Sequence, residues 1–117
     1  MKPADFRKIA LSMPESAEGS HMGHADFRVK NKIFATLFSR DDVELGMVKL
    51  KPDQQRQFVS AHPDAFAPVK GGWGRGGATE VILKHAKAAA VKNAMMAAWI
   101  NTAPKGLVES SGISGDD

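Results

Sequence analysis

The sequence predicts a single α+β domain with a largely antiparallel β-sheet packed against helices. Helical patterns stand near both ends of the chain, and alternating apolar and polar residues between them indicate consecutive short strands. Short polar turns separate these strands, which is typical of an antiparallel meander. The 117 residues suffice for one hydrophobic core and leave no room for a second domain.

The first half of the chain predicts a helix followed by the meander. Apolar residues recur at spacings of three and four from Pro3, and Pro14 ends this helical pattern. Alternation then replaces it and indicates strands. The expected segments are a helix over 3–12, strands over 17–21, 27–29, 33–38 and 45–50, and turns at Asn31-Lys32 and over 39–42.

The second half predicts the helices that cover the sheet. Pro52 suits the first position of a helix, and a stripe containing Val91, Met95 and Trp99 marks the longest helix. Residues 106–117 are rich in Gly, Ser and Asp, so we expect a mobile acidic tail after a domain of residues 1–105. The expected segments are a helix from 52 to about 61, a helical turn over 64–66, a glycine-rich loop over 71–77, a strand over 79–83 and a helix over 85–103.

The composition excludes several classes of protein. No apolar run approaches the roughly 18 residues of a membrane span, and the N-terminus lacks a signal-peptide core. Because there is no cysteine, we expect neither disulfides nor a thiol nucleophile. Because no targeting segment is visible, we expect a cytoplasmic location. The net charge of +3 gives weak steering toward a polyanion, although residues 68–87 are locally basic.

The most unusual segment is the glycine-rich loop, residues 71–77, which contains Trp73 and Arg75. An indole ring beside a guanidinium suits nucleic acid or an anionic ligand. The alternative is that Trp73 plugs one end of the core while the glycines form a corner. The loop is neither a Walker nor a dinucleotide-binding motif, because it lacks the Gly-Lys-Ser/Thr ending and a strand, rather than a helix, follows it.

No catalytic constellation is assembled in the sequence. Ser20, His21 and Asp26 are the only residues that resemble a nucleophile with a base, and such proximity is common by chance. The acidic cluster of Asp41, Asp42 and Glu44 falls in an expected turn, where carboxylates are usually solvated. We therefore expect no enzymatic activity and no cofactor.

Two further clusters have structural interpretations. His21 and His24 have a spacing that could ligate a metal, but a zinc site needs further ligands, so we expect histidines hydrogen-bonded in a turn and no metal. Met95, Met96 and Trp99 could line a ligand pocket, yet a helical stripe of this kind usually fills a core.

Several segments resemble the MmcQ/YjbR family of small bacterial proteins. They are residues 21–29, 32–35, 47–50, 73–74 and 103–105, and their order and spacing extend the similarity from Phe6 to Lys105. The resemblance implies a CyaY-like α+β fold in a double-wing arrangement, whose projecting β-hairpins contact DNA. Lys51 departs from the family's usual Thr or Ser, so a side-chain cap for the helix after it is missing.

Carried onto this chain, the resemblance implies a DNA interface on two segments. The candidate contacts are Arg28, Lys30 and Lys32 on the first hairpin, Lys70, Trp73 and Arg75 on the glycine-rich loop, and Lys105 at the end of the last helix. Exposed cations on hairpins can instead simply protect sheet edges. A second hypothesis is a monomeric protein that binds an aromatic or anionic small molecule near Trp73 and Trp99. An exposed Trp73 would favour one of these binding functions, whereas a buried Trp73 would indicate that it plugs one end of the core.

Overall fold

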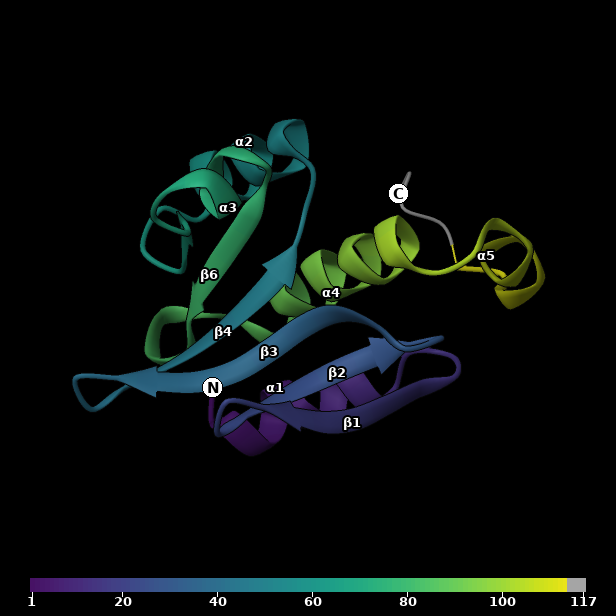
Figure 1. Ribbon diagram of the computed structural model, residues 1–117. Coiled ribbons are helices and arrows are strands. Elements are labelled where there is room, and N and C mark those ends of the chain that lie inside the picture. The colour runs from purple at the N-terminus through teal and green to yellow at the C-terminus, as the bar shows by residue number, and fades with distance from the viewer. Residues whose placement is uncertain (114–117) are drawn as a thin grey trace.

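Three tight hairpins connect four consecutive strands in the computed structural model, which describes residues 1–113 (Figure 1). The strands are β1 (Ser16–His21), β2 (His24–Val29), β3 (Lys32–Arg40) and β4 (Val43–Lys49). Each turn has two residues with positive φ, namely Met22-Gly23, Lys30-Asn31 and Asp41-Asp42. This geometry matches the twist of paired strands. The turn expected at Asn31-Lys32 is wrong by one residue, because Lys32 already begins β3.

The second half of the chain completes the sheet and supplies most of the helices. Its elements are α2 (Pro52–Ala61), β5 (Phe66–Pro68), α3 (Gly72–Arg75), β6 (Ala78–Ile82), the 3-10 turn η1 (Leu83–His85), α4 (Ala88–Thr102) and α5 (Lys105–Ser111). The six strands follow the order β1-β2-β3-β4-β6-β5, and every neighbouring pair is antiparallel. The predicted α+β class with an antiparallel sheet is confirmed.

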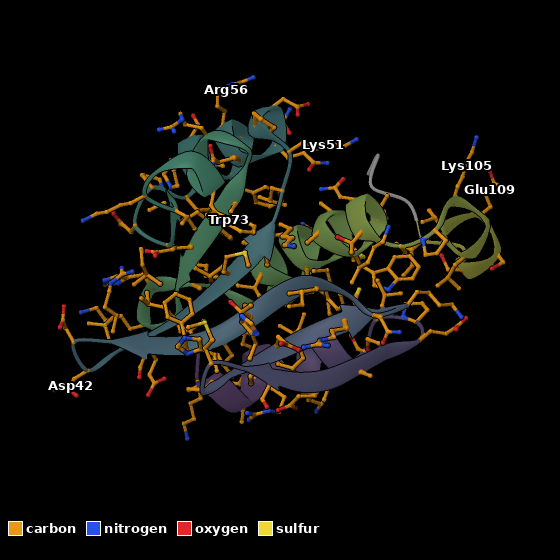
Figure 2. All side chains as sticks on the ribbon, viewed as in Figure 1. Asp42, Lys51, Arg56, Trp73, Lys105 and Glu109 are labelled. Atoms are coloured by element: carbon orange, nitrogen blue, oxygen red, sulfur yellow. The ribbon has the colours of Figure 1, made fainter. Side chains whose placement is uncertain are left out.

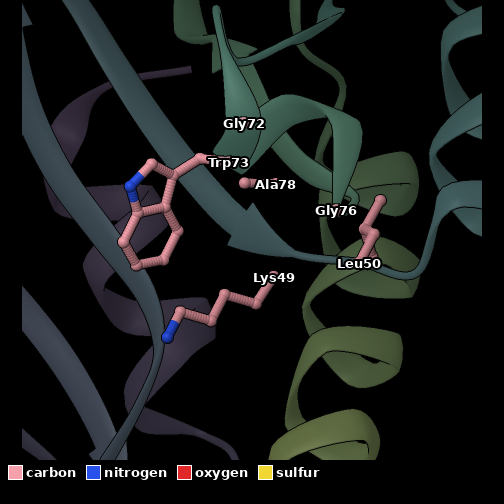
Figure 3. Close-up of a pocket in the computed structure, with 6 residues that line it drawn as sticks. All are labelled: Lys49, Leu50, Gly72, Trp73, Gly76 and Ala78. Carbon is pink, nitrogen blue, oxygen red and sulfur yellow. The ribbon is translucent and has the colours of Figure 1, made fainter.

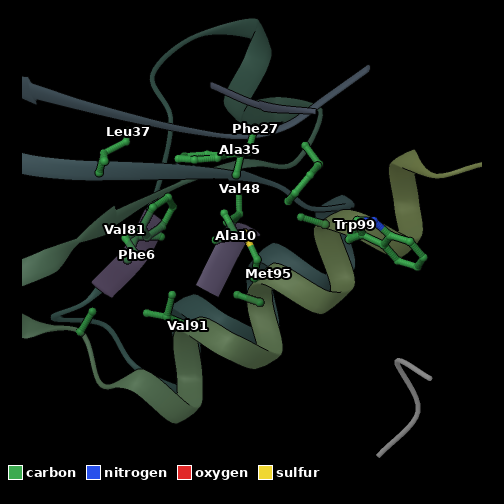
Figure 4. Packing of buried hydrophobic residues seen from close by; sticks show 14 of the residues in the cluster. Phe6, Ala10, Phe27, Ala35, Leu37, Val48, Val81, Val91, Met95 and Trp99 are labelled. Carbon is green, nitrogen blue, oxygen red and sulfur yellow. The ribbon is translucent and has the colours of Figure 1, made fainter. Parts of the chain in front are cut away.

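Helices α1 (Pro3–Leu11) and α4 cover one face of the sheet and enclose the core (Figure 4). Phe6 of α1 and Met95 of α4 are fully buried against strand residues such as Val48. Trp99 is 0% exposed, and its indole N–H donates to the carbonyl oxygen of Pro14 at 3.0 Å. The interpretation of this helical stripe as core is therefore confirmed.

The opposite surface of the sheet, called the open face below, carries the alternate side chains of the strands. Strand register places the following residues on it: His24, Asp26, Thr36, Phe38, Leu45, Met47, Lys49, Glu80 and Ile82. Figure 1 views the sheet from this side, with α1 behind the strands. Among the described residues, α3 is the element that stands at the edge of this face, beside β6 and the end of β4.

The structure corrects four sequence-based expectations. Strand β5 begins at Phe66, where a helical turn was expected, and residues 72–75 form the short helix α3 within the expected loop. The long helix begins at Ala88 rather than at 85. Within the expected tail, α5 spans Lys105–Ser111, and Leu107, Val108 and Ile113 pack half-buried against the core. Residues 114–117 lie outside the described residues, and the mobility of this segment stays a prediction.

Two smaller observations complete the fold. Lys51 provides no side-chain cap for α2, as expected, but the Gln54 side chain accepts a hydrogen bond from the Lys51 backbone N–H at 2.8 Å. Within residues 1–113, no helix is long and apolar enough to cross a membrane.

Candidate functional site

The glycine-rich segment is held in place by backbone contacts that leave no space for side chains. A Cβ atom on Gly74 would lie 1.6 Å from the carbonyl oxygen of Val69, and one on Gly77 would lie 2.0 Å from the carbonyl oxygen of Leu50. Gly77 also has a φ of +114°, a conformation that other residues rarely adopt. These two glycines therefore allow α3 to dock directly onto neighbouring backbone.

Gln55 of α2 ties this docked segment to the sheet. Its buried side-chain amide donates two hydrogen bonds of 2.9 Å, one to the carbonyl oxygen of Gly74 and one to that of Ala78. The Thr79 hydroxyl adds a 2.8 Å bond to the carbonyl oxygen of Gly77. Buried polar groups satisfied in this way fix one arrangement of the backbone. The glycine-rich segment is therefore held in one conformation, despite its glycine content.

Trp73 projects from α3 onto the open face and is 70% exposed (Figure 2). It is not a core plug. The Lys49 ammonium lies 5.6 Å from the centre of the indole ring, within the range of a cation–π contact. Figure 3 shows the two side chains extending in the same direction from neighbouring elements. An aromatic surface and a cation thus stand together at one point of the molecule.

A shallow cavity of about 440 Å³ adjoins this pair. Its lining is formed by Lys49, Leu50, Gly72, Trp73, Gly76 and Ala78 (Figure 3). The glycines contribute backbone rather than side chain, so a ligand could approach the main chain closely. The arrangement can stack a flat ring against the indole and place a negative charge near Lys49.

Arg75 does not share this point with Trp73. Residues two apart on a helix project toward different sides of it, so α3 separates the two side chains that the sequence places together. Arg75 and Lys70 are both exposed, and within residues 1–113 no salt bridge links Lys49, Lys70 or Arg75 to a carboxylate. Lys49 is therefore the cation at the indole ring. Arg75 belongs to the glycine-rich segment, and Lys70 directly precedes that segment.

The predicted residues of the first hairpin are engaged within the protein. Arg28 binds the carboxylate of buried Asp26 through two hydrogen bonds of 2.8 and 3.0 Å. These bonds lower the pKa of Asp26 against the opposing effect of burial, and they raise the pKa of Arg28. Lys30 forms an exposed salt bridge of 2.7 Å with Glu15.

The seven predicted contact residues do not gather at one place. Lys32 is exposed at the start of β3, and Lys105 is exposed at the start of α5. In Figure 2, Lys105 stands at the right-hand end of the molecule, away from Trp73. Of the seven, only Trp73 lines the cavity, where Lys49 joins it, while Lys70 and Arg75 lie nearby in the chain.

The resemblance of Ser20, His21 and Asp26 to a catalytic set is not realised. Ser20 pairs with Ala25 and Gly19 with Asp26, so the Ser20 and Asp26 side chains point to opposite faces of the sheet. Both oxygens of Asp26 are already bonded to Arg28. Within residues 1–113, no three His, Asp or Glu side chains are grouped closely enough to hold a metal ion.

Sequence reasoning missed Lys49 and Gln55. Lys49 alternates with apolar neighbours on its strand, so its position indicates exposure, but nothing local indicates that Trp73 meets it. Gln55 is the buried polar residue of a helix whose other polar side chains are exposed or half-buried, and the sequence gives no sign of this.

Comparisons with known proteins agree with this architecture. A family model described as YjbR matches residues 11–103. Among solved structures, the chain is similar to the Deinococcus radiodurans protein DR2400, whose domain is described as DUF419, with a TM-score of 0.72 and 18% identity. The similarity covers 97% of this chain and 93% of that one and concerns the fold alone. No curated protein matches the sequence.

Proposed function

The chain belongs to the YjbR family, and we propose that it is a non-catalytic nucleic-acid-binding protein whose binding site centres on Trp73. The observation that supports this proposal is an indole ring that is 70% exposed on a rigid segment, with the Lys49 ammonium 5.6 Å from its centre. Stacking on an exposed aromatic ring and attraction of phosphate by lysine are the two general components of sequence-tolerant nucleic-acid binding.

The rigidity of α3, which carries Trp73, favours binding. A side chain on a mobile loop loses conformational entropy when it binds, whereas α3 is already fixed by Gln55 and by the contact of Gly74 with Val69. Lys70 and Arg75 extend the basic surface around Trp73 and are the proposed phosphate contacts. Arg28 and Lys30 contribute less in this proposal because they belong to the β2–β3 hairpin, which β4 separates from β6 and α3.

Tryptophan fluorescence offers a direct test, because the chain has two tryptophans with opposite environments. Trp99 is fully buried, so a change in emission on binding reports Trp73. Titration with oligonucleotides at low salt should quench this emission. Trp73→Ala should weaken binding by about 1–3 kcal/mol, the usual contribution of one stacked base.

Cation variants test the phosphate contribution. Lys49→Ala should weaken binding and lower the salt dependence by about one phosphate contact. Lys92→Ala is the matched control, because Lys92 is exposed on α4, which covers the face of the sheet opposite the open face. The proposal is wrong if no binding is detected at low salt, or if Trp73→Ala binds as well as the unmodified protein.

The cavity favours a second candidate function, binding of an aromatic anion of low molecular weight. Its volume of about 440 Å³ falls within the range of small-molecule sites. Trp99 takes no part, because it is fully buried in the core. A mononucleotide that binds as tightly as an oligonucleotide would favour this candidate over nucleic acid.

A further inference from the structure

The open face differs from an ordinary solvated sheet surface. Outward positions of antiparallel strands are usually polar, yet here neighbouring strands present Phe38, Met47 and Ile82, each half-buried. These side chains do not belong to the main core cluster on the helical side. The open face therefore carries an apolar strip among its polar side chains, and this strip begins near Lys49 and runs away from Trp73.

A second aromatic surface stands at the far part of this strip. Phe38 meets the exposed His24 ring edge-on, with ring centres 5.9 Å apart. Phe38 pairs with Leu45, and Leu45 precedes Lys49 by four residues on the same strand. Four residues of extended strand span about 13 Å. Trp73 and Phe38 are thus two separate stacking positions on one face.

The guanidinium of Arg40 reaches between these two positions. Arg40 pairs with Val43, beyond Phe38, but the Glu80 that it binds pairs with Met47, which lies between Leu45 and Lys49. Arg40 of β3 binds Glu80 of β6 through hydrogen bonds of 2.8 and 3.0 Å, and because β4 lies between those strands, the pair crosses over it. The Arg40 side chain remains 54% exposed, which leaves its outer side open to a phosphate. Lys49 provides a second cation at the Trp73 end.

We infer that the open face binds single-stranded nucleic acid, with one base stacked on Trp73, another on Phe38, and the phosphates between them near Lys49 and Arg40. This inference rests on the proposed function and specifies its ligand. A duplex hides its base faces in its own stack, whereas a single strand can offer them to aromatic side chains.

Fluorescence anisotropy with labelled ligands tests the inference. The ligands are single-stranded DNA and RNA of about 12 nucleotides, the matching duplex, and a mononucleotide. We expect at least one single strand to bind more tightly than both the duplex and the mononucleotide. Phe38→Leu, which keeps the side chain apolar but removes the ring, should weaken binding of that strand by about fivefold to 100-fold and leave mononucleotide binding unchanged.

Two controls make the outcome interpretable. His24→Ala removes an exposed ring beside Phe38 and should also weaken oligonucleotide binding, without the risk of disturbing the fold. Leu11→Ala removes an exposed apolar side chain from α1, behind the sheet, and should have no effect. If binding depends on Trp73 but the duplex binds as tightly as the single strand, or if neither Phe38→Leu nor His24→Ala has an effect, the inference is wrong and the proposed function stands. If no ligand binds, both are wrong.

Discussion

Gly74 provides a sharp test of whether the glycine-rich segment is rigid. The substitution Gly74→Ala would place a Cβ atom 1.6 Å from the Val69 carbonyl oxygen, about half of the 3.0 Å below which real Cβ contacts essentially do not occur. The obstacle is backbone rather than a flexible side chain, so α3 would have to move away from Val69. Such a movement would strain or break the hydrogen bond from Gln55 to the Gly74 carbonyl oxygen.

The expected cost follows from these contacts. Overpacking alone costs about 1–3 kcal/mol, and a buried amide that loses its partner adds about 1–3 kcal/mol. We therefore expect Gly74→Ala to lower the free energy of unfolding by about 3 kcal/mol, or the Tm by roughly 10 °C for a domain of this size. Thermal unfolding followed by circular dichroism measures this change.

Gly72→Ala is the matched control on the same helix. A Cβ atom there would come no closer than 3.5 Å to the end of the Arg75 side chain, which is ordinary contact. Alanine also favours the helix by about 0.5–1 kcal/mol, so this variant should be as stable as the unmodified protein or slightly more so. If Gly74→Ala unfolds at the same temperature as Gly72→Ala, the segment is not held as described.

Two further predictions concern buried polar groups. The pKa of Asp26 is lowered by Arg28, so its charge stabilises the fold at pH values above the ordinary carboxyl pKa of about 3.9, and this stability is lost as pH falls through the lowered value. Measured by urea unfolding, Asp26→Asn should lower the free energy of unfolding by about 1–3 kcal/mol at neutral pH and make that free energy depend less on pH in the acid range. Glu18→Gln, which changes the exposed pair with Arg7, should change the free energy of unfolding little. Gln55→Leu should lower the free energy of unfolding by about 1–3 kcal/mol, because two buried carbonyl oxygens lose their donor. Gln57→Leu, on the exposed side of α2, should leave the free energy of unfolding nearly unchanged. Equal stability of the two variants would contradict this role of Gln55.

The elements that the sequence predicted well are those with a local signal. The helical stripe through Val91 and Trp99 repeats over fifteen residues, and the strands show alternation, although the turn between β2 and β3 was placed one residue too late. In both cases the pattern lies within the segment itself, so a few neighbouring residues suffice to specify the structure.

The elements that were missed depend on residues distant in sequence. Strand β5 has three residues and exists because Phe66 pairs with Val81. Helix α3 contains two glycines among four residues, a composition that disfavours helix, and the docking of Gly74 against Val69 overrides that preference. Composition likewise predicted a tail without buried apolar surface, although Leu107 and Val108 reach the core.

The candidate site follows the same division. Composition singled out Trp73 within the glycine-rich segment, but the cation beside it is Lys49 of β4, which the tertiary fold brings there. Arg75 is two residues away in the chain, yet helical geometry turns it to another side. Contacts between elements, rather than spacing within one, decide which charge meets the ring.

The two tryptophans give the site its physical rationale. Trp99 stabilises the fold by burying its whole ring and satisfying its N–H, whereas Trp73 leaves most of its ring in water and stabilises the folded protein little. Nevertheless, close backbone contacts at Gly74 and Gly77, where a side chain of any other residue would clash, hold the segment that carries Trp73 in one position. A large exposed ring that is held rigid beside a cation loses little entropy when it binds, so the arrangement favours a partner that covers the ring over a role in stability.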